Sequence, residues 1–424
     1  MYKGILYAST LALFLLSEGS LYYLGIPYTQ KYGSFFAKIH PSLYLFSLLA
    51  MLLLAMAVVN GGVKFYRHGI YHFFLFSIAV FYTIFAFLRP DYKGGEVTAL
   101  AVTFLTPTVM YYCLFYADDA QRKKLYNAIS LFFIINSLVG IWEFQTGMRL
   151  FPFIAGEGIK EYDWRSTAFL GHPLNNACLT GSYLIYQLLS SRSKRSISWL
   201  LQIVILLLSM FAFGGRSAMA TLALLLLVAT FLSLIKPVFT GKTDAAMRRS
   251  LWLLATALIF VPLMFSADFV RPAIERFSND GGSAVQRLAA IQILSGLTPS
   301  QLLIGTSTSY RTTMYEVFNT KSGIEVSWIA LAVEYGLPFS LMIALTLSAW
   351  LFRLGSGGGR AVWWMIVYFL LVIAGSLSIG SKSVLLAQFA LMVTVIANRE
   401  NSLENNSRNL ESISGKKNRI DYVS

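Results

Sequence analysis

The chain has 424 residues, of which 56% are hydrophobic and 13% are charged, against about 45–50% and about 25% in ordinary globular chains. This composition excludes an ordinary soluble domain, because the apolar residues fall into runs of about 17–25 residues, the length that crosses a bilayer. The net charge of +14 would indicate nucleic acid in a soluble protein. Basic inner loops of a membrane protein explain most of it, so we expect no nucleic acid partner.

The apolar runs predict an all-α, polytopic transmembrane bundle of about twelve spans. Near-continuous runs favour helices over barrel strands, in which polar and apolar residues would alternate. We expect the first span to be a retained helix, because no small-residue cleavage site and soluble domain follow it. In chain order the predicted spans are Ile5–Ile26, Pro41–Asn60, Ile70–Leu88, Val97–Ala117, Leu125–Phe144, Leu174–Leu189, Ile197–Phe213, Ser217–Ile235, Leu251–Phe265, Val326–Phe352, Val362–Gly380 and Val384–Ala397.

The charges of the short loops predict the orientation of the bundle. With a cytoplasmic N-terminus, most loop lysines and arginines fall on the inner side, which is the positive-inside bias. These residues are Lys64, Arg67, Arg122, Lys123, Lys124, Arg192, Lys194, Arg195, Lys236, Lys242, Arg248, Arg249, Arg353 and Arg360. We therefore expect a membrane domain over residues 1–397 and a polar, disordered cytoplasmic tail over residues 398–424. Both termini would be cytoplasmic.

Two polar segments interrupt the helical pattern, and both fall on the outer side. One is Gln145–Pro173. The other, Ala267–Glu325, is the longest polar stretch and would form a long periplasmic loop that carries short helices. A helix is predicted from Ser283, after two glycines, and a shorter one from Pro299 to Gly305. The first of these helices has an apolar stripe formed by Val285, Leu288, Ile291 and Leu294.

Five segments in and around these loops carry a family resemblance. They are WRSTAFLGHPLNNACLTG (164–181), FGGRSAMATLALLL (213–226), RLAAIQIL (287–294), PSQLLIGTSTSY (299–310) and VSWIALAVEYGLP (326–338). In their order and placement they resemble the O-antigen polymerase/ligase superfamily, over roughly residues 164–340. The resemblance implies a glycosyltransferase of the bacterial inner membrane that needs no metal and no other cofactor. The expected partners are an undecaprenyl-diphosphate-linked oligosaccharide, membrane lipid and a chain-length regulator.

The resemblance assigns the carrier diphosphate to Arg216 and Arg287, with help from Arg165. Guanidinium groups suit this task, because they offer two parallel hydrogen bonds to a phosphate and stay charged at any physiological pH. Each arginine also has a simpler interpretation: Arg216 as an interfacial residue that reaches lipid head groups, and Arg287 as part of a solvated helix face. Three further arginines of the long loop are expected in salt bridges or lipid phosphate contacts: Arg271, Arg276 and Arg311.

The candidate general bases are Glu325 and His172. The ligases of the superfamily have a histidine at the position of Glu325, counted back from Glu334 and Gly336, so this chain departs from the ligase pattern. A carboxylate there can still accept a proton from the attacking hydroxyl, although a glutamate at a helix start is also favoured by the helix dipole. His172 lies in a Gly-His-Pro sequence at the outer end of a predicted span.

The departure at Glu325 favours a polymerase, which joins lipid-linked repeat units, over a ligase, which transfers glycan to lipid A core. A transporter or flippase is the remaining alternative. Carriers usually have internal repeats and broken helices at mid-membrane, whereas the polar residues of this chain gather in outer loops. The sugar, the linkage, the polymer and the oligomeric state do not follow from the sequence.

Overall fold

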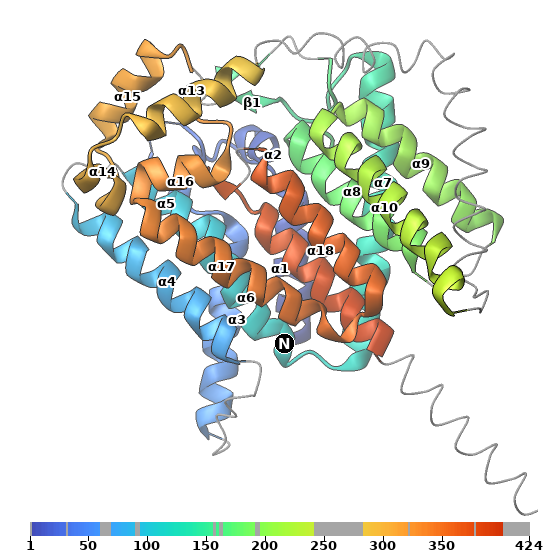
Figure 1. The fold of residues 1–424 in the computed structure, drawn as a ribbon. Helices are drawn as coiled ribbons and strands as arrows, with labels where there is room; N and C mark the ends of the chain where they lie inside the picture. Colours follow the sequence, from blue (N-terminus) through green and yellow to red (C-terminus); the bar gives the residue numbers. More distant parts are fainter. Residues whose placement is uncertain are drawn as a thin grey trace, which may run out of the picture.

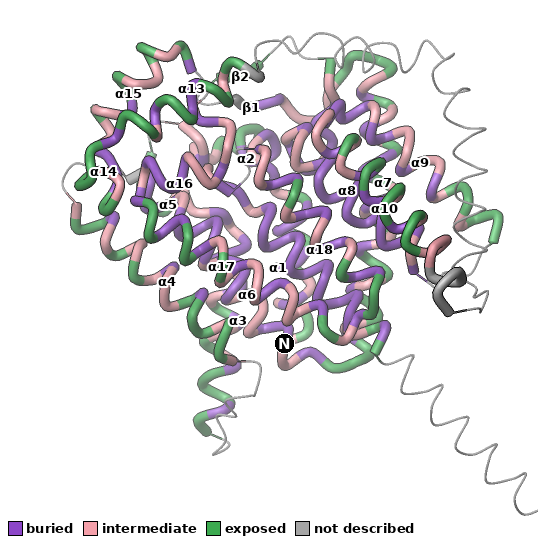
Figure 2. Tube along the Cα trace, in the orientation of Figure 1, coloured by how far each residue is buried: buried purple, intermediate pink, exposed green. Residues whose placement is uncertain are grey.

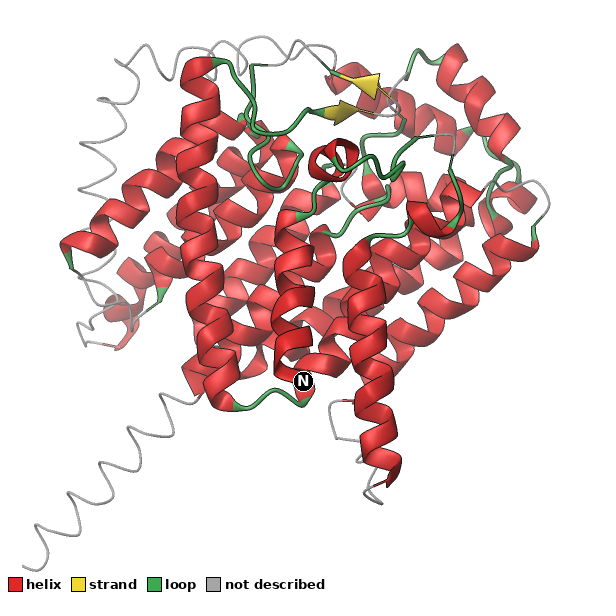
Figure 3. Ribbon diagram, turned by 180° about the vertical axis from the view of Figure 1, so that it is seen from behind, coloured by secondary structure: helices red, strands yellow, loops and turns green. Residues whose placement is uncertain are grey.

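The computed structural model describes residues 2–30, 33–59, 69–89, 94–155, 158–160, 164–190, 196–240, 283–320, 323–376 and 379–401. The described residues are predominantly helical. The described strands are the two-residue β1 (Ile154–Ala155) and β2 (Gly158–Ile159), which pair antiparallel above one end of the helices (Figure 3). The prediction of an all-α protein is confirmed.

The helices follow the predicted apolar runs. In chain order they are α1 (Tyr2–Leu15), α2 (Glu18–Tyr23), α3 (Pro41–Val59), α4 (Gly69–Leu88), α5 (Gly94–Leu100), the π-helical turn η2 (Ala101–Leu105), α6 (Thr106–Phe115), α7 (Asp119–Thr146), α8 (Pro173–Leu189), α9 (Ile197–Phe213), α10 (Arg216–Thr240), α13 (Ser283–Ser295), α14 (Pro299–Ile304), α15 (Thr308–Val317), α16 (Ser327–Tyr335), α17 (Leu337–Leu354) and α18 (Gly359–Ala374). Residues 385–401 form the last described helix.

Six helical stretches of the described residues are long and apolar enough to cross a membrane. They are Pro41–Val59, Gly69–Leu88, Gly95–Phe115, Asp119–Thr146, Arg216–Ile235 and Leu337–Leu354. The predicted span Leu251–Phe265 lies outside the described residues. This arrangement fits a membrane protein.

Two predicted spans are each divided into two helices. The first breaks before α2, where the Ser17 side chain accepts a hydrogen bond from the Ser20 backbone N–H. The span predicted over Val326–Phe352 breaks at Gly336, which has φ +96° and lies so close to α14 that a Cβ atom would be 2.3 Å from the Leu303 carbonyl oxygen. Only glycine tolerates both conditions, and the chain therefore turns between α16 and α17.

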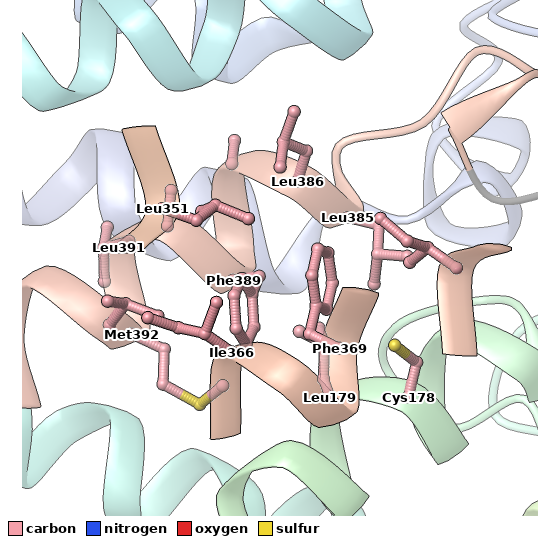
Figure 4. Packing of buried hydrophobic residues seen from close by; sticks show 14 of the residues in the cluster. Cys178, Leu179, Leu351, Ile366, Phe369, Leu385, Leu386, Phe389, Leu391 and Met392 are labelled. Carbon is pink, nitrogen blue, oxygen red and sulfur yellow. The ribbon is translucent and has the colours of Figure 1, made fainter. Parts of the chain in front are cut away.

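The core is built around α8, α18 and helix 385–401. Phe369 and Phe389 stack with ring centroids 3.6 Å apart (Figure 4). Gly181 of α8 leaves room for Tyr368, whose hydroxyl would lie 2.0 Å from a Cβ atom at this position. By contrast, α4 buries only Leu75, Ala79 and Ala86, and its remaining surface is largely exposed and apolar (Figure 2). Such a surface suits lipid rather than water.

The two ends of the bundle differ. At one end Tyr2 donates to the Tyr116 carbonyl oxygen, Lys3 pairs with Asp118, and Tyr186 bonds Glu400. The described parts of both predicted outer segments lie together at the opposite end, with α2 (Figure 1). We call it the loop end. Helix 385–401 runs past the predicted span end at Ala397, and the rest of the predicted tail, 402–424, lies outside the described residues.

Helices α13, α14 and α15 form a cap on α16. We call residues 283–317 the cap. The helix predicted from Ser283 is confirmed, but its apolar stripe faces mainly outward: Val285, Leu288 and Ile291 are 67%, 62% and 56% exposed. The buried face instead contains Ala290 and Ile293, which pack with residues of α16, as does Leu297 just after the helix. The small alanine lets α13 approach α16 closely.

Candidate anion-binding site at the loop end

A cavity of about 280 Å³ opens at the loop end, next to the end of α7. Its lining residues are Glu143, Phe144, Gly147, Arg149, Trp164, Arg165 and Ser166. One predicted site residue, Arg165, is among them. The cavity therefore combines two arginines with two aromatic rings, at the loop end of a helix that is long enough to cross a membrane.

The end of α7 determines where the cavity begins. Gly147 adopts φ +70° as the C-cap, and its N–H donates to the Glu143 carbonyl oxygen. This left-handed cap stops the helix. The described residues that follow, 147–155, 158–160 and 164–172, fold back over the helix ends, and we call them the loop 147–172.

Glu143 anchors both sides of this loop. Its side chain is buried, and Oε2 accepts hydrogen bonds from Ser166 Oγ (2.7 Å), Thr167 N (2.9 Å) and Ala168 N (2.9 Å). Oε1 accepts from Leu150 N at 2.9 Å. A buried carboxylate is stable when donors surround it in this way. Because Leu150 follows Arg149 and Ser166 follows Arg165, the same carboxylate positions both arginines.

A pair of asparagines fixes the next part of the loop. Asn136 Nδ2 donates to Asn176 Oδ1 at 2.8 Å, and Asn176 Nδ2 donates to the Thr167 carbonyl oxygen at 2.6 Å. Asn136 Oδ1 accepts from Phe169 N at 3.0 Å. Between these contacts Ala168 has φ +38°, a backbone conformation that persists only where the surroundings enforce it. The loop is thus rigidly attached to α7 and α8.

The two arginines that line the cavity are half-buried and lie next to each other. Arg149 Nη2 donates to the Arg165 carbonyl oxygen at 3.2 Å, and its guanidinium lies over the Phe153 ring. The side chain of Arg165 crosses Gly214, where a Cβ atom would be 2.9 Å from Arg165 Cγ. Arg149 was not predicted, since it belongs to no motif and its neighbours become evident only when the loop is folded.

The turn before α10 brings Arg216 to the same region. Gly214 has φ +59° and caps α9, and Gly215 packs so closely on α8 that a Cβ atom would be 2.5 Å from Ala177 Cβ. Arg216 is then the first residue of α10. The structure therefore places Arg165 against the turn that carries Arg216. The positive end of the α10 dipole adds to the charge of these arginines.

Arg287 lies elsewhere at the loop end. It is exposed on α13, and α13 packs on α16 rather than on α8, α9 or α10. Glu325 also belongs to the cap region: it is half-buried between Ile324, which packs in the cap core, and the start of α16.

His172 is the N-cap of α8. Its Nδ1 accepts a hydrogen bond from Leu174 N at 3.2 Å, and its ring lies edge-on to Phe153. While this contact lasts, Nδ1 is not available to accept another proton, so His172 can act as a base only when the contact opens. His172 also borders a second cavity of about 30 Å³, together with Glu18 and His40. A cavity of this size has room for about one ordered water.

Arg311 makes the salt bridge that the sequence suggested for it. Its Nη2 lies 2.6 Å from Glu96 Oε1 and 3.9 Å from Glu334 Oε1, and its side chain is 6% exposed. Nη1 donates to the Thr306 carbonyl oxygen at 2.8 Å. This buried cluster attaches the cap to α5 and α16. Arg271 and Arg276 lie outside the described residues.

In comparisons with known proteins, no family model and no curated protein matches this chain. The family resemblance therefore depends on the sequence motifs alone, and function has to be argued from the site.

Proposed function

We propose that this chain is a polysaccharide polymerase: a membrane glycosyltransferase that transfers glycan from a polyprenyl diphosphate to the hydroxyl of an acceptor lipid-linked repeat unit. The observation that carries the proposal is the group of Arg149, Arg165 and Arg216 at one end of a bundle with span-length helices. A diphosphate attached to a membrane lipid would meet cationic side chains at this end.

The chemistry requires a stabilised leaving group. The acceptor oxygen attacks the anomeric carbon, the bond from this carbon to the carrier phosphate breaks, and the carrier diphosphate leaves with the electron pair. Fixed guanidinium groups stabilise the charge that develops on the leaving phosphate. The proton of the acceptor hydroxyl passes to a carboxylate or imidazole, for which Glu325 and His172 are the proposed candidates.

The proposal places the loop end outside the bacterial inner membrane and both termini in the cytoplasm. Support comes from the basic residues of the predicted inner loops and from the position of Tyr2 and Glu400 at the end opposite to the arginines. The polyprenyl chain would then lie along the bundle with its diphosphate at the loop end.

Substitution of the arginines tests the function. In cells that depend on this chain, Arg165→Ala and Arg216→Ala should abolish polymer while the protein still reaches the membrane, and Arg→Lys should restore only part of it, because lysine lacks the two-pronged donor. Arg287→Ala tests the remaining arginine that the resemblance assigns. Exposed Arg360 provides the matched control, and its alanine variant should make normal polymer. Normal polymer from both Arg165→Ala and Arg216→Ala would reject the site.

The same cells distinguish a polymerase from a ligase. Loss of a polymerase leaves single repeat units on the carrier, whereas loss of a ligase leaves full-length polymer there. Glu325→Gln should slow chain growth by about 10²–10⁴-fold if Glu325 is the base, and Glu325→Asp should keep part of the activity. A normal rate in Glu325→Gln would move this role to His172 or to no residue at all.

A further inference from the structure

The cavity beside α7 has an aromatic wall as well as a charged one. Trp164 and Phe144 lie edge to face with ring centroids 5.7 Å apart, and Trp164 is 36% exposed. Both rings line the cavity together with Arg149 and Arg165. An anion site alone needs no such rings, and a lipid tail needs no arginines.

A sugar attached to a phosphate matches both walls. One face of a pyranose ring presents C–H groups, which an aromatic ring covers favourably, while the hydroxyls at its edge stay hydrated or hydrogen-bonded. In a glycosyl diphosphate this ring is joined directly to the phosphate. In the cavity, the tryptophan likewise lies next to the two arginines.

Among the described residues that line the cavity, the carboxylate of Glu143 already has hydrogen-bond partners. Glu143 accepts four hydrogen bonds from the loop, and these donors stabilise its negative charge in place. The guanidinium of Arg149 is held at the Arg165 carbonyl oxygen and over Phe153, so that little rearrangement is needed to bind a ligand.

We infer that this cavity binds the first sugar of a glycosyl diphosphate, with Trp164 against the sugar ring and with Arg149 and Arg165 at the phosphates. The identity of the ligand rests on the proposed function. The position of the tryptophan next to two arginines is independent of it.

Two probes that differ only in the sugar test the inference. The purified full-length protein would be titrated with a short-chain prenyl diphosphate that carries one hexose, and with the same prenyl diphosphate without the sugar. Trp164→Ala should weaken binding of the first probe by about tenfold and leave binding of the second unchanged. Trp164→Phe, which keeps a ring, should lose less. Trp363, 45% exposed on α18, is the matched control and should affect neither probe.

The outcomes separate this inference from the proposed function. If Trp164→Ala weakens both probes alike or neither, the sugar contact is rejected. Should the alanine variant not fold, a loss in Trp164→Phe that is equal for the two probes rejects the sugar contact as well. If Arg149→Gln and Arg165→Gln leave the bare prenyl diphosphate bound as before, the diphosphate site and the proposed function fail, whatever Trp164 does.

Discussion

A buried charge helps to attach the loop 147–172 to the bundle, and another helps to attach the cap, but the two attachments differ in kind. Glu143 binds the loop through neutral donors: three backbone N–H groups and one hydroxyl. Arg311, which belongs to the cap, binds carboxylates of α5 and α16, and the neutral Thr306 carbonyl oxygen is a further acceptor. The first is a charged group within a hydrogen-bond network, and the second is a buried ion cluster.

The difference predicts how each region responds when its charge is removed. A network of neutral donors loses hydrogen bonds, but no opposite charge is left behind. An ion cluster that loses its cation leaves carboxylates in a buried site, where the cost of their desolvation is no longer offset. The cap should therefore be the more sensitive region.

The largest effect is expected for Arg311→Met, which keeps the length of the side chain but removes its charge. Glu96, 9% exposed, and Glu334 would remain close together without a cation. Loss of one partner of a buried ion pair typically costs about 3–5 kcal/mol. Thermal unfolding of the purified protein and the amide hydrogen exchange of α14 and α15 would measure the loss, with exposed Arg360→Met as the control.

A second substitution sharpens this prediction. Arg311→Met with Glu96→Gln removes the cation and one carboxylate together, so part of the lost stability should return. If the double variant is less stable than Arg311→Met by the full effect of Glu96→Gln alone, the two residues are not coupled, and the cap is attached by other contacts.

A smaller effect is expected for Glu143→Gln. The amide oxygen can accept the three hydrogen bonds that Oε2 now accepts. The amide N–H₂ group then takes the place of Oε1 and faces the Leu150 N–H; both groups are donors, so this hydrogen bond is lost. One lost hydrogen bond of this kind costs about 1–3 kcal/mol. Because Leu150 adjoins Arg149, the affinity for a bare prenyl diphosphate should fall as well. Unchanged affinity would show that Glu143 supports the fold without positioning the arginine.

Local signals made most of the fold predictable. The predicted span Ile197–Phe213 has the same bounds as α9, and the start of α13 at Ser283 follows from the two glycines before it. The break at Gly336 was not predicted, since its cause is the close approach of α14, which no local pattern reports.

The site was harder to predict than the fold. Arg165 and the turn of Arg216 were identified from motifs, and the structure places them together. Glu143 was not identified, because its hydrogen-bond partners lie as far along the chain as Ala168, and because its neighbours in the sequence form a predicted apolar span. The cluster of Glu96 and Arg311 joins residues that are 215 positions apart. Contacts of this kind depend on packing, which a single sequence does not contain.

The smallest effect is expected at the opposite end of the bundle, where a third charged side chain is exposed. Asp118 caps α7: it accepts a hydrogen bond from Gln121 N at 2.7 Å, and Gln121 Oε1 accepts from Asp118 N at 2.9 Å. Its salt bridge with Lys3 spans 3.3 Å between side chains that are 64% and 51% exposed. Exposed ion pairs contribute little, so the cap interaction should matter more than the charge of the pair.

Three variants separate these two contributions. Lys3→Gln should leave the unfolding temperature of the purified protein unchanged, Asp118→Asn should lower it slightly, because asparagine still caps a helix, and Asp118→Ala should lower it most. The Gln121 N–H bond, more than Lys3, lowers the pKa of Asp118 below the usual aspartate range. A carboxyl whose pKa is lowered on folding binds fewer protons when folded, so its stabilising contribution is complete at neutral pH and is lost as the pH falls through this lowered pKa. The difference between the wild type and Asp118→Asn should accordingly vanish in acid. A larger loss in Lys3→Gln than in Asp118→Ala would show that the exposed charge pair, rather than the helix cap, stabilises this end.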